Sequence, residues 1–157
     1  MEALKVKVRR LHDGAILPTY ATDGSGAFDL YAADVNGFVG QTRLAVNELC
    51  GLTCGTGLAF EIPPGYVMLV FSRSGHGFKF ATRLANCVGV IDSDYRGEVA
   101  VRLTADPMPE HEAPLMVSPG DRVAQAIIVP FPRVAFEWAE TLSETDRGAS
   151  GFGSTGA

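Results

Sequence analysis

The stretch NCVGVIDSDYRGE, residues 86–98, carries both a structural and a chemical signal. An apolar run over 87–91 leads into the polar segment Asp92 to Gly97, and a second apolar alternation starts at Glu98. Short apolar runs bounded by turn residues are typical of β-strands. We therefore expect a β-hairpin whose turn presents two carboxylates, a tyrosine and an arginine.

The polar turn of this stretch is open to two interpretations. A carboxylate on a rigid hairpin can act as a general base that activates water, and Tyr95 can offer a flat wall to a ring. The alternative is an ordinary solvated turn, because Asp and Ser are favoured in turns in any case. The residues of the stretch alone do not decide between them.

Further short apolar runs lie on both sides of this stretch. Leu4, Val6 and Val8 alternate with charged residues, as in a half-buried strand. The other runs cover residues 27–33, 43–46, 57–62, 66–71, 123–131 and 134–138. A weak, glycine-containing helix is expected at 74–84. Many short strands separated by turn signals predict an all-β sandwich or barrel.

The composition limits the classes of protein that the chain can represent. The 157 residues suggest one domain, and the 18 glycines and 9 prolines favour a fold rich in turns. The net charge of −5, without a lysine or arginine cluster, disfavours a nucleic-acid partner. We expect no membrane segment and a cytoplasmic location, because there is no signal-like stretch and the run 66–71 is too short to span a bilayer.

The three cysteines, Cys50, Cys54 and Cys87, are an odd number with no histidine at close spacing. This argues against a disulfide framework and against a zinc site. We expect reduced and mostly buried thiols.

The segment FSRSGHG, residues 71–77, indicates phosphate binding. Arg73 offers a planar fork of donors for phosphate oxygens, and Ser74 adds a hydroxyl. The first N–H groups of a helix that starts here could also bind an anion. The alternative is a capped turn with one surface arginine.

Two further polar residues interrupt apolar strands. Gln125 stands within GDRVAQAIIV, residues 120–129, where its amide faces a partner chain, a site or the outside of an edge strand. Asp29 lies between Phe28 and Leu30, so it points away from a core that those two would enter. It can pair with an arginine, hold a metal-bound water or lie exposed.

The chain ends in RGASGFGSTGA, residues 147–157, a glycine-rich segment that is flexible by composition. Residues 148–155 nearly match the phosphate-loop pattern, but Ser154 replaces its lysine. Backbone amides here could still cradle phosphates, with charge from Arg147 and a stacking surface from Phe152. The alternative is a frayed terminus. We expect a β-barrel domain over 1–141 and a flexible arm over 142–157.

Taken together, GAFDLYA, SRSG, GVIDSDYRGE, GDRVAQ and RGASGFGSTG resemble, in this order, the five motifs of the trimeric dUTP diphosphatases (dUTPases). The resemblance covers Gly26 to Gly156. It implies a jelly-roll β-barrel that forms a homotrimer, with three active sites that each draw motifs from all three chains. The implied reaction is hydrolysis of dUTP to dUMP and diphosphate, with Mg2+ held mainly by the phosphates. It would limit uracil in DNA and supply dUMP for thymidylate synthesis.

The resemblance also implies roles for individual residues. Asp92 matches the base that activates water for attack on the α-phosphorus, with Asp94 as a secondary carboxylate, and Tyr95 packs under the deoxyribose. The uracil-reading positions are Asn86, Gly89, Val90 and Ile91. Phosphate contacts fall on Arg73, Ser74, Gly75 and Gln125, and Asp29 can hold a Mg2+-bound water. On the arm, Arg147, Gly153, Ser154 and Thr155 match the γ-phosphate clamp, and Phe152 the ring over uracil.

Three positions depart from the usual motifs. Ser72 stands where many family members have proline, Asp121 where Gln or Glu is expected, and His76 where an apolar residue is common. Two alternatives are kept beside dUTP hydrolysis. One is a dCTP deaminase-like enzyme, which shares the fold but needs a glutamate base. The other is a nucleotide-binding regulatory trimer that does not hydrolyse its ligand.

Overall fold

The computed structural model describes residues 3–40, 43–47, 51–107 and 113–151. Within these ranges the chain forms strands joined by turns and a single short helix. The elements are β1 (Lys7–Arg10), β2 (Thr19–Tyr20), β3 (Phe28–Tyr31), β4 (Asp34–Val35), β5 (Leu44–Ala45), β6 (Leu52–Gly55), β7 (Leu58–Glu61), β8 (Tyr66–Phe71), α1 (Ser74–Phe80), β9 (Thr82–Leu84), β10 (Val88–Ile91), β11 (Ala100–Ala105), β12 (Met116–Val117) and β13 (Arg122–Pro130).

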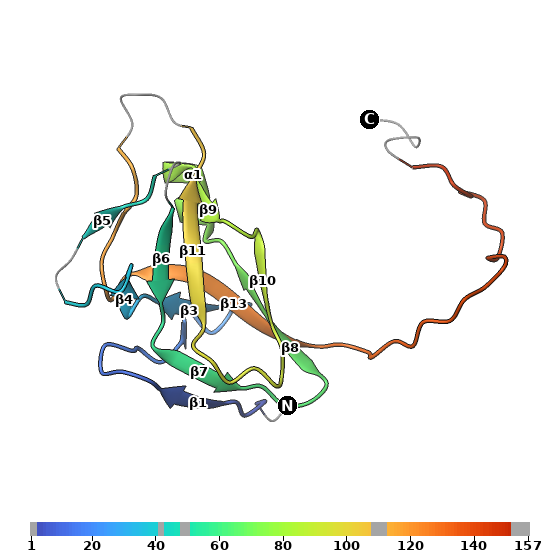
Figure 1. The fold of residues 1–157 in the computed structure, drawn as a ribbon, viewed down its shortest axis with the longest axis horizontal. Helices are drawn as coiled ribbons and strands as arrows, with labels where there is room; N and C mark the ends of the chain where they lie inside the picture. The colour runs from blue at the N-terminus through green and yellow to red at the C-terminus, as the bar shows by residue number, and fades with distance from the viewer. Residues whose placement is uncertain (1–2, 41–42, 48–50, 108–112, 152–157) are drawn as a thin grey trace.

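Two antiparallel sheets form the body of the molecule (Figure 1). One has the order β10-β8-β13-β3-β2 and the other the order β4-β6-β11-β9, while β1-β7 and β12-β5 form two small pairs. The predominantly β fold is confirmed. Closure into a jelly-roll barrel stays a prediction.

The hydrophobic core lies between these sheets. From the first sheet, Met68 and Val70 of β8 and Ala126 of β13 are fully buried. From the second sheet, Leu52 of β6 and Leu103 of β11 pack against them in the same cluster. The alternation of buried and partly exposed residues along β8 is the two-residue period of a strand that covers a core on one face.

The register of the larger sheet brings four of the motifs together. Asp29 of β3 pairs with Gln125 of β13, which pairs with Phe71 of β8, which in turn pairs with Val88 of β10. Four neighbouring strands thus place these residues in one row across the sheet. We call this the motif row, because it joins segments up to about a hundred residues apart in the sequence.

The hairpin expected over 86–98 is not formed. The strand β10 pairs with β8, whereas β11 pairs with β6 and β9 in the other sheet. The reason lies at Val99, which is buried, donates its N–H to Leu58 and gives its carbonyl to Thr56. The chain after Glu98 therefore joins the second sheet, and β11 does not pair with β10.

Two other expectations are corrected by the structure. The helix expected over 74–84 ends at Phe80, because Ala81 adopts a left-handed conformation (φ 46°), and 82–84 form β9 instead. No strand forms over 134–138 in the single chain. The chain leaves the body after β13 and runs outward as an extended segment, without a neighbouring strand to pair with (Figure 1). A single strand gains no ladder hydrogen bonds without a neighbouring strand, so the alternating pattern alone does not form one here.

The cysteines follow the expectation only in part. Cys54 is fully buried, and burial raises the pKa of its thiol to about 12. Cys87 is exposed, contrary to the expectation of mostly buried thiols, and Cys50 lies outside the described residues. In the described ranges, no helix combines the length and apolarity needed to cross a membrane.

Candidate active site

Asp29 is the centre of an ionic network at the motif row. It is only 9% exposed, and its two carboxylate oxygens accept from two arginines. Arg73 Nε lies 3.1 Å from Oδ1, and Arg122 Nη1 lies 3.2 Å from Oδ2. The expected pairing with an arginine is confirmed, and the alternative of an exposed strand residue is wrong. One buried carboxylate thus orients two guanidinium groups from different strand ends.

Arg73 is held by a second neighbour, the buried His76 of α1. The Nη1 of Arg73 lies 3.2 Å from Nε2 of His76. Burial, and then the charge of Arg73, lower the pKa of this imidazole. Because arginine stays protonated, the neutral ring accepts this hydrogen bond at Nε2 and carries its proton at Nδ1, which has no partner. His76 therefore positions Arg73, and its departure from the apolar residue of the family motif has a structural role.

Gln125 and Ser72 tie the end of β8 to its neighbours. The side-chain amide of Gln125 donates to the Ser72 carbonyl at 3.0 Å, and the Ser72 hydroxyl accepts from the Leu84 N–H at 2.9 Å. Proline at position 72 could not accept this second bond. Because β13 lies between β3 and β8, the edge-strand interpretation of Gln125 is wrong.

A cavity of about 390 Å³ opens beside these groups. Arg73, Ser74 and Gln125 line it, together with Arg83. Ser74 and Gly75 are exposed at the start of α1. Guanidinium, hydroxyl and amide donors around one opening are the groups that bind phosphate oxygens.

A second hollow, of about 460 Å³, lies between β10 and β11. Its lining includes Asn86, Gly89, Val90 and Ile91, the four positions expected to read a base. Glycine is favoured at position 89, because a Cβ would lie 3.2 Å from Cβ of Val70 on the paired strand, a tight contact. Main-chain groups and one amide side chain can recognise the edge of a planar ring by hydrogen bonds.

The turn after β10 is pinned by its own side chains. The Arg96 Nη1 donates to the Ser93 carbonyl at 2.7 Å, and the phenol of Tyr95 donates to the Glu98 carbonyl at 3.0 Å. A Cβ at Gly97 would lie 2.6 Å from Cζ of Tyr95, so only glycine lets the ring lie across the turn. Asp92 is exposed on this turn, as a general base must be to reach water.

The single chain does not bring every expected site residue together. Val88 pairs with Phe71 and Ile91 with Met68, so Asp92 follows the end of β10 that is remote from Arg73. Four residues of strand correspond to about 13 Å. Arg147 lies on the outward segment and donates to the Ser150 carbonyl at 2.9 Å. Phe152, Gly153, Ser154 and Thr155 lie outside the described residues.

The structure adds Arg122 to the residues that the sequence had singled out. It begins β13, two residues after Gly120, and looks like an ordinary charged residue of a turn. Its role becomes visible only through its bond to Asp29, which is 93 positions away. Asp121, one of the departures, accepts from the Ser118 N–H at 2.8 Å and closes the preceding turn.

Two arginines ordered by one carboxylate, beside an opening lined by phosphate-binding donors and a second hollow lined by β10 and Asn86, are the features of a protein that binds a phosphorylated ligand on a β-sheet framework. The comparisons with known proteins then give the family. The dUTPase family model matches residues 13–156. This chain belongs to the dUTPase family.

Curated relatives and solved structures agree with this assignment. A deoxyuridine 5'-triphosphate nucleotidohydrolase of Syntrophotalea carbinolica is 38% identical over 156 residues, and that of Anaplasma marginale is 42% identical over 155 residues. These alignments cover 98–99% of this chain and 99% of each relative.

The structural comparison confirms the dUTPase-like fold. A mutant dUTPase of Staphylococcus bacteriophage 80alpha with dUpNHpp superimposes with a TM-score of 0.82, at 23% identity, over 99% of this chain and all of that one. A mutant dUTPase of phage phi11 of S. aureus, with a structural Mg(II) ion, gives a TM-score of 0.70 at 22% identity, over 88% of this chain and 98% of that one.

Proposed function

We propose that this chain hydrolyses dUTP to dUMP and diphosphate by attack of an Asp92-activated water on the α-phosphorus. Membership of the dUTPase family, with relatives about 40% identical over nearly their whole length, supports the reaction. The observation that carries the assignment of the site is the motif row, in which Asp29, Gln125, Phe71 and Val88 align four motifs on adjacent strands.

The phosphates bind on the Arg73 side of the row. Asp29 holds Nε of Arg73 and His76 holds Nη1, while Nη2 has no partner among the described residues. A guanidinium fixed in this way can donate to a phosphate oxygen without first losing rotamer freedom. Ser74, Gly75 and Gln125 complete the set of phosphate contacts.

The base and sugar bind at β10 and its turn. Asn86 and the backbone of residues 89–91 read uracil, because cytosine presents the opposite donor and acceptor pattern at its edge. The methyl group of thymine would clash with this tight segment. Tyr95 packs under the deoxyribose and leaves no room for a 2′-hydroxyl; its bond to the Glu98 carbonyl keeps the ring in place.

The chemical step needs one general base. Asp92 takes a proton from the attacking water, whose oxygen bonds to the α-phosphorus, while the bond to the bridging oxygen of the β-phosphate breaks. Diphosphate leaves with that oxygen. A positioned carboxylate supplies about 10²- to 10⁴-fold in such a step.

Mg2+ fits this site through the substrate rather than through direct protein ligands. Both oxygens of Asp29 are occupied by arginines, and its side chain is only 12% exposed. A carboxylate with spare lone pairs can still accept from a metal-bound water. When bound, Mg2+ would neutralise charge on the phosphates, and Asp29 is the residue that would hold one of its waters.

We further propose a homotrimer in which a second copy completes each site. In one chain, Asp92 and Arg73 lie at opposite ends of β10, which supports a site shared between subunits. Every residue of the outward segment over 131–150 is exposed, and the large apolar residues Val134, Phe136 and Trp138 stand at every second position, which is the pattern of a strand without its sheet. The chain thus presents an unpartnered strand that a neighbouring copy can receive.

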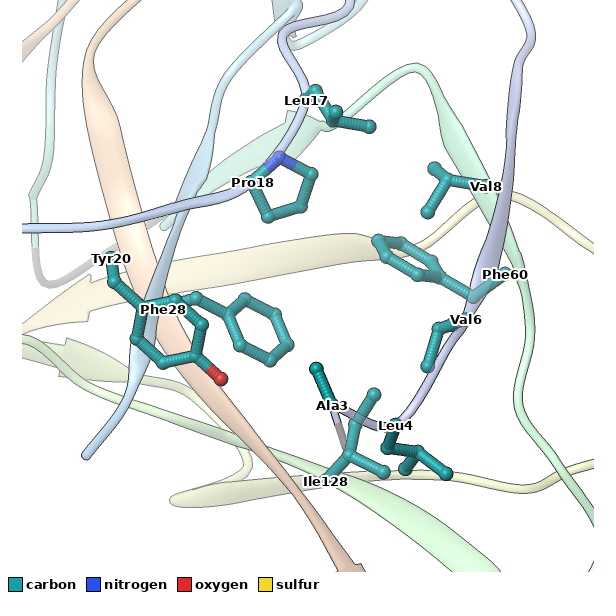
Figure 2. Close-up of a pocket in the computed structure, with 10 residues that line it drawn as sticks. All are labelled: Ala3, Leu4, Val6, Val8, Leu17, Pro18, Tyr20, Phe28, Phe60 and Ile128. Atoms are coloured by element: carbon teal, nitrogen blue, oxygen red, sulfur yellow. The ribbon is translucent and has the colours of Figure 1, made fainter. Parts of the chain in front are cut away.

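The receiving surface is an apolar groove of about 540 Å³ beside β1 (Figure 2). Figure 2 shows the rings of Phe28 and Phe60 on opposite sides of this groove. Among the described strands β1 pairs only with β7, so its other edge can accept a strand. The occupant that we propose is residues 134–138 of a second copy.

The C-terminal arm then reaches a neighbouring active site. Arg147, Gly153, Ser154 and Thr155 clamp the γ-phosphate, and Phe152 stacks over uracil. Closure of a flexible arm excludes water during the reaction, and opening releases the products. The free thiols of Cys54 and Cys87 support a reducing, cytoplasmic location.

The variant Asp92→Asn tests the assignment of the base. We expect it to bind a non-hydrolysable dUTP analogue as wild type does, and to lose at least about 100-fold in kcat. Asp23→Asn, which changes an exposed acid in another turn, is the control and should keep wild-type turnover. A nearly unchanged rate in Asp92→Asn would remove Asp92 from the mechanism.

A further inference from the structure

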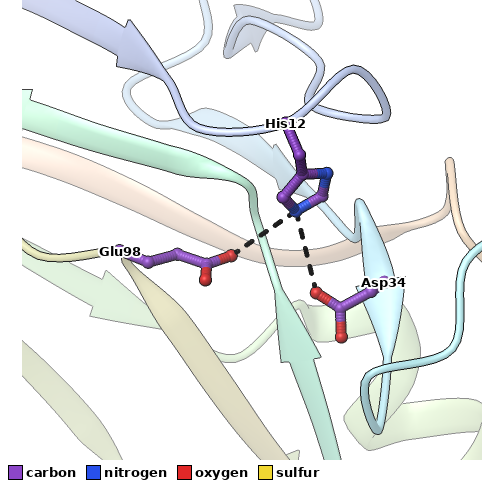
Figure 3. Close-up of side chains that lie close together, drawn as sticks. All are labelled: His12, Asp34 and Glu98. Atoms are coloured by element: carbon purple, nitrogen blue, oxygen red, sulfur yellow. Dashed lines mark ion pairs between the residues drawn. The ribbon is translucent and has the colours of Figure 1, made fainter.

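A cluster of three metal-ligating side chains lies outside the proposed active site (Figure 3). His12 follows β1, Asp34 begins β4, and Glu98 lies just before β11. The Nε2 of His12 is 3.9 Å from Oδ2 of Asp34 and 3.9 Å from Oε1 of Glu98. Figure 3 shows the imidazole pointing between the two carboxylates, and all three ligand atoms lie within 4.8 Å of one another.

Two glycines of the segment between β6 and β7 make room for this cluster. A Cβ at Gly55 would collide with Oδ2 of Asp34 and would lie 2.7 Å from Oε1 of Glu98. A Cβ at Gly57 would lie 2.8 Å from Nε2 of His12. The positive φ of Gly57 (64°) also favours glycine, but no such conformational reason exists at Gly55. The space between the three ligand atoms is therefore kept clear of side chains.

Backbone donors hold both carboxylates in place. The Gly37 N–H donates to Oδ1 of Asp34 at 2.8 Å, and the Gly57 N–H donates to Oε1 of Glu98 at 2.7 Å. A carboxylate oxygen that accepts one N–H bond keeps a further lone pair, so Oδ2 of Asp34 and Oε1 of Glu98 can still face a cation together with Nε2 of His12. Hydrogen bonds of this kind orient ligands before a metal binds.

We propose that His12, Asp34 and Glu98 bind a divalent transition-metal ion of the Zn2+ type. One imidazole nitrogen with two carboxylates is a borderline ligand set, which suits Zn2+ better than the all-oxygen preference of Mg2+. With ligand bonds of about 2.0–2.2 Å, three side chains can surround the ion after an inward shift of about half an ångström, leaving a position for water. The half-buried position of all three residues leaves an entry path.

This ion would stabilise the turn that carries Tyr95. Glu98 provides the carboxylate for the metal and also the carbonyl that accepts from the Tyr95 phenol. The next residue, Val99, is locked by backbone bonds to Leu58 and Thr56. A metal at Glu98 therefore fixes the end of the turn without contacting the phosphate side of the site.

The test is titration of the full, nucleotide-free chain with ZnCl2 by isothermal calorimetry, together with thermal unfolding. Wild type should bind one Zn2+ per chain and gain about 5 °C in Tm at saturation. His12→Ala and Glu98→Gln should each weaken binding at least tenfold, because loss of an outer-shell partner alone costs about 10- to 100-fold. The glutamine keeps an oxygen for the Gly57 N–H, so this variant should fold.

Two controls locate the ion. Asp13→Asn removes an exposed acid next to His12, and Asp92→Asn removes the active-site acid; both should bind Zn2+ as wild type does. Absence of binding to wild type overturns the proposal, since the three side chains then interact only with one another. Unchanged binding in His12→Ala also overturns it, because the ion then lies elsewhere.

Discussion

Replacing Asp29 by asparagine removes the charge that orders the phosphate side of the site. The carboxylate accepts from Arg73 at 3.1 Å and from Arg122 at 3.2 Å, and its side chain is 12% exposed. Removal of one partner from a buried ion pair costs about 3–5 kcal/mol in the free energy of unfolding. Because the arginine side chains are 23% and 47% exposed, water relieves part of this cost. We expect a loss of about 2–3 kcal/mol.

This loss predicts a measurable change in both stability and turnover. For a chain of this length it corresponds to a Tm lower by about 5–10 °C. Asparagine keeps one acceptor oxygen but turns an NH2 donor toward the other guanidinium, so it cannot accept from both Arg73 and Arg122 and Arg73 is held less firmly for phosphate. We expect kcat/KM for dUTP to fall by about 10- to 100-fold, which is about 1.4–2.7 kcal/mol of transition-state stabilisation.

The matched control is Asp106→Asn. Asp106 accepts from Arg83 at 3.1–3.3 Å, in comparable geometry, but their side chains are 55% and 44% exposed. An exposed pair of this kind contributes less than about 1 kcal/mol. Thermal unfolding and Mg2+-dependent dUTP turnover of both variants give the comparison. If Asp29→Asn unfolds within about 2 °C of wild type with normal kcat/KM, the buried network neither stabilises the fold nor orders the phosphate side of the site.

Three further perturbations follow from the structure. His76 has a pKa below its ordinary value of 6.5 in the folded state, so the unfolded chain binds more protons between the two values. The free energy of unfolding should therefore fall as pH drops through this window, by at most about 1.4 kcal/mol per pH unit. Between about pH 7.5 and about pH 5, His76→Leu should lose less Tm than wild type does. Tyr95→Phe removes the bond to the Glu98 carbonyl. We expect a loss of about 1 kcal/mol in the free energy of unfolding and weaker discrimination against UTP in a competition assay. Unchanged discrimination would contradict the role of the phenol. Deletion of 147–157 should lower turnover sharply and leave the oligomer intact by size-exclusion chromatography, and normal turnover would exclude the arm as a lid.

Local periodicity predicted most of the strands correctly. The run YVMLVF coincides with β8 (Tyr66–Phe71), because its alternate side chains enter the core. Asp29 could be assigned to the face opposite its apolar neighbours in the same way. The identity of its partners could not be predicted, since Arg73 and Arg122 are 44 and 93 positions away and meet Asp29 only through the sheet register.

The failures have physical causes of the same kind. The hairpin expected at Asp92 was wrong because Val99 binds to Leu58 and Thr56 in the other sheet, a contact that no local pattern encodes. The apolar alternation at 134–138 is real, but it has no partner strand within the described chain. His12, Asp34 and Glu98 could not be grouped from the sequence, because they belong to three separate segments without the spacing of a metal motif.

The central claim is that dUTP is cleaved by attack of water on the α-phosphorus. The most direct measurement is turnover of dUTP with Mg2+ in ¹⁸O-labelled water, with the products separated and analysed by mass spectrometry, beside parallel reactions with dCTP, dTTP and UTP. We predict that dUTP alone is consumed and that the label is found in dUMP. Label in diphosphate, or release of ammonia from dCTP, would contradict it.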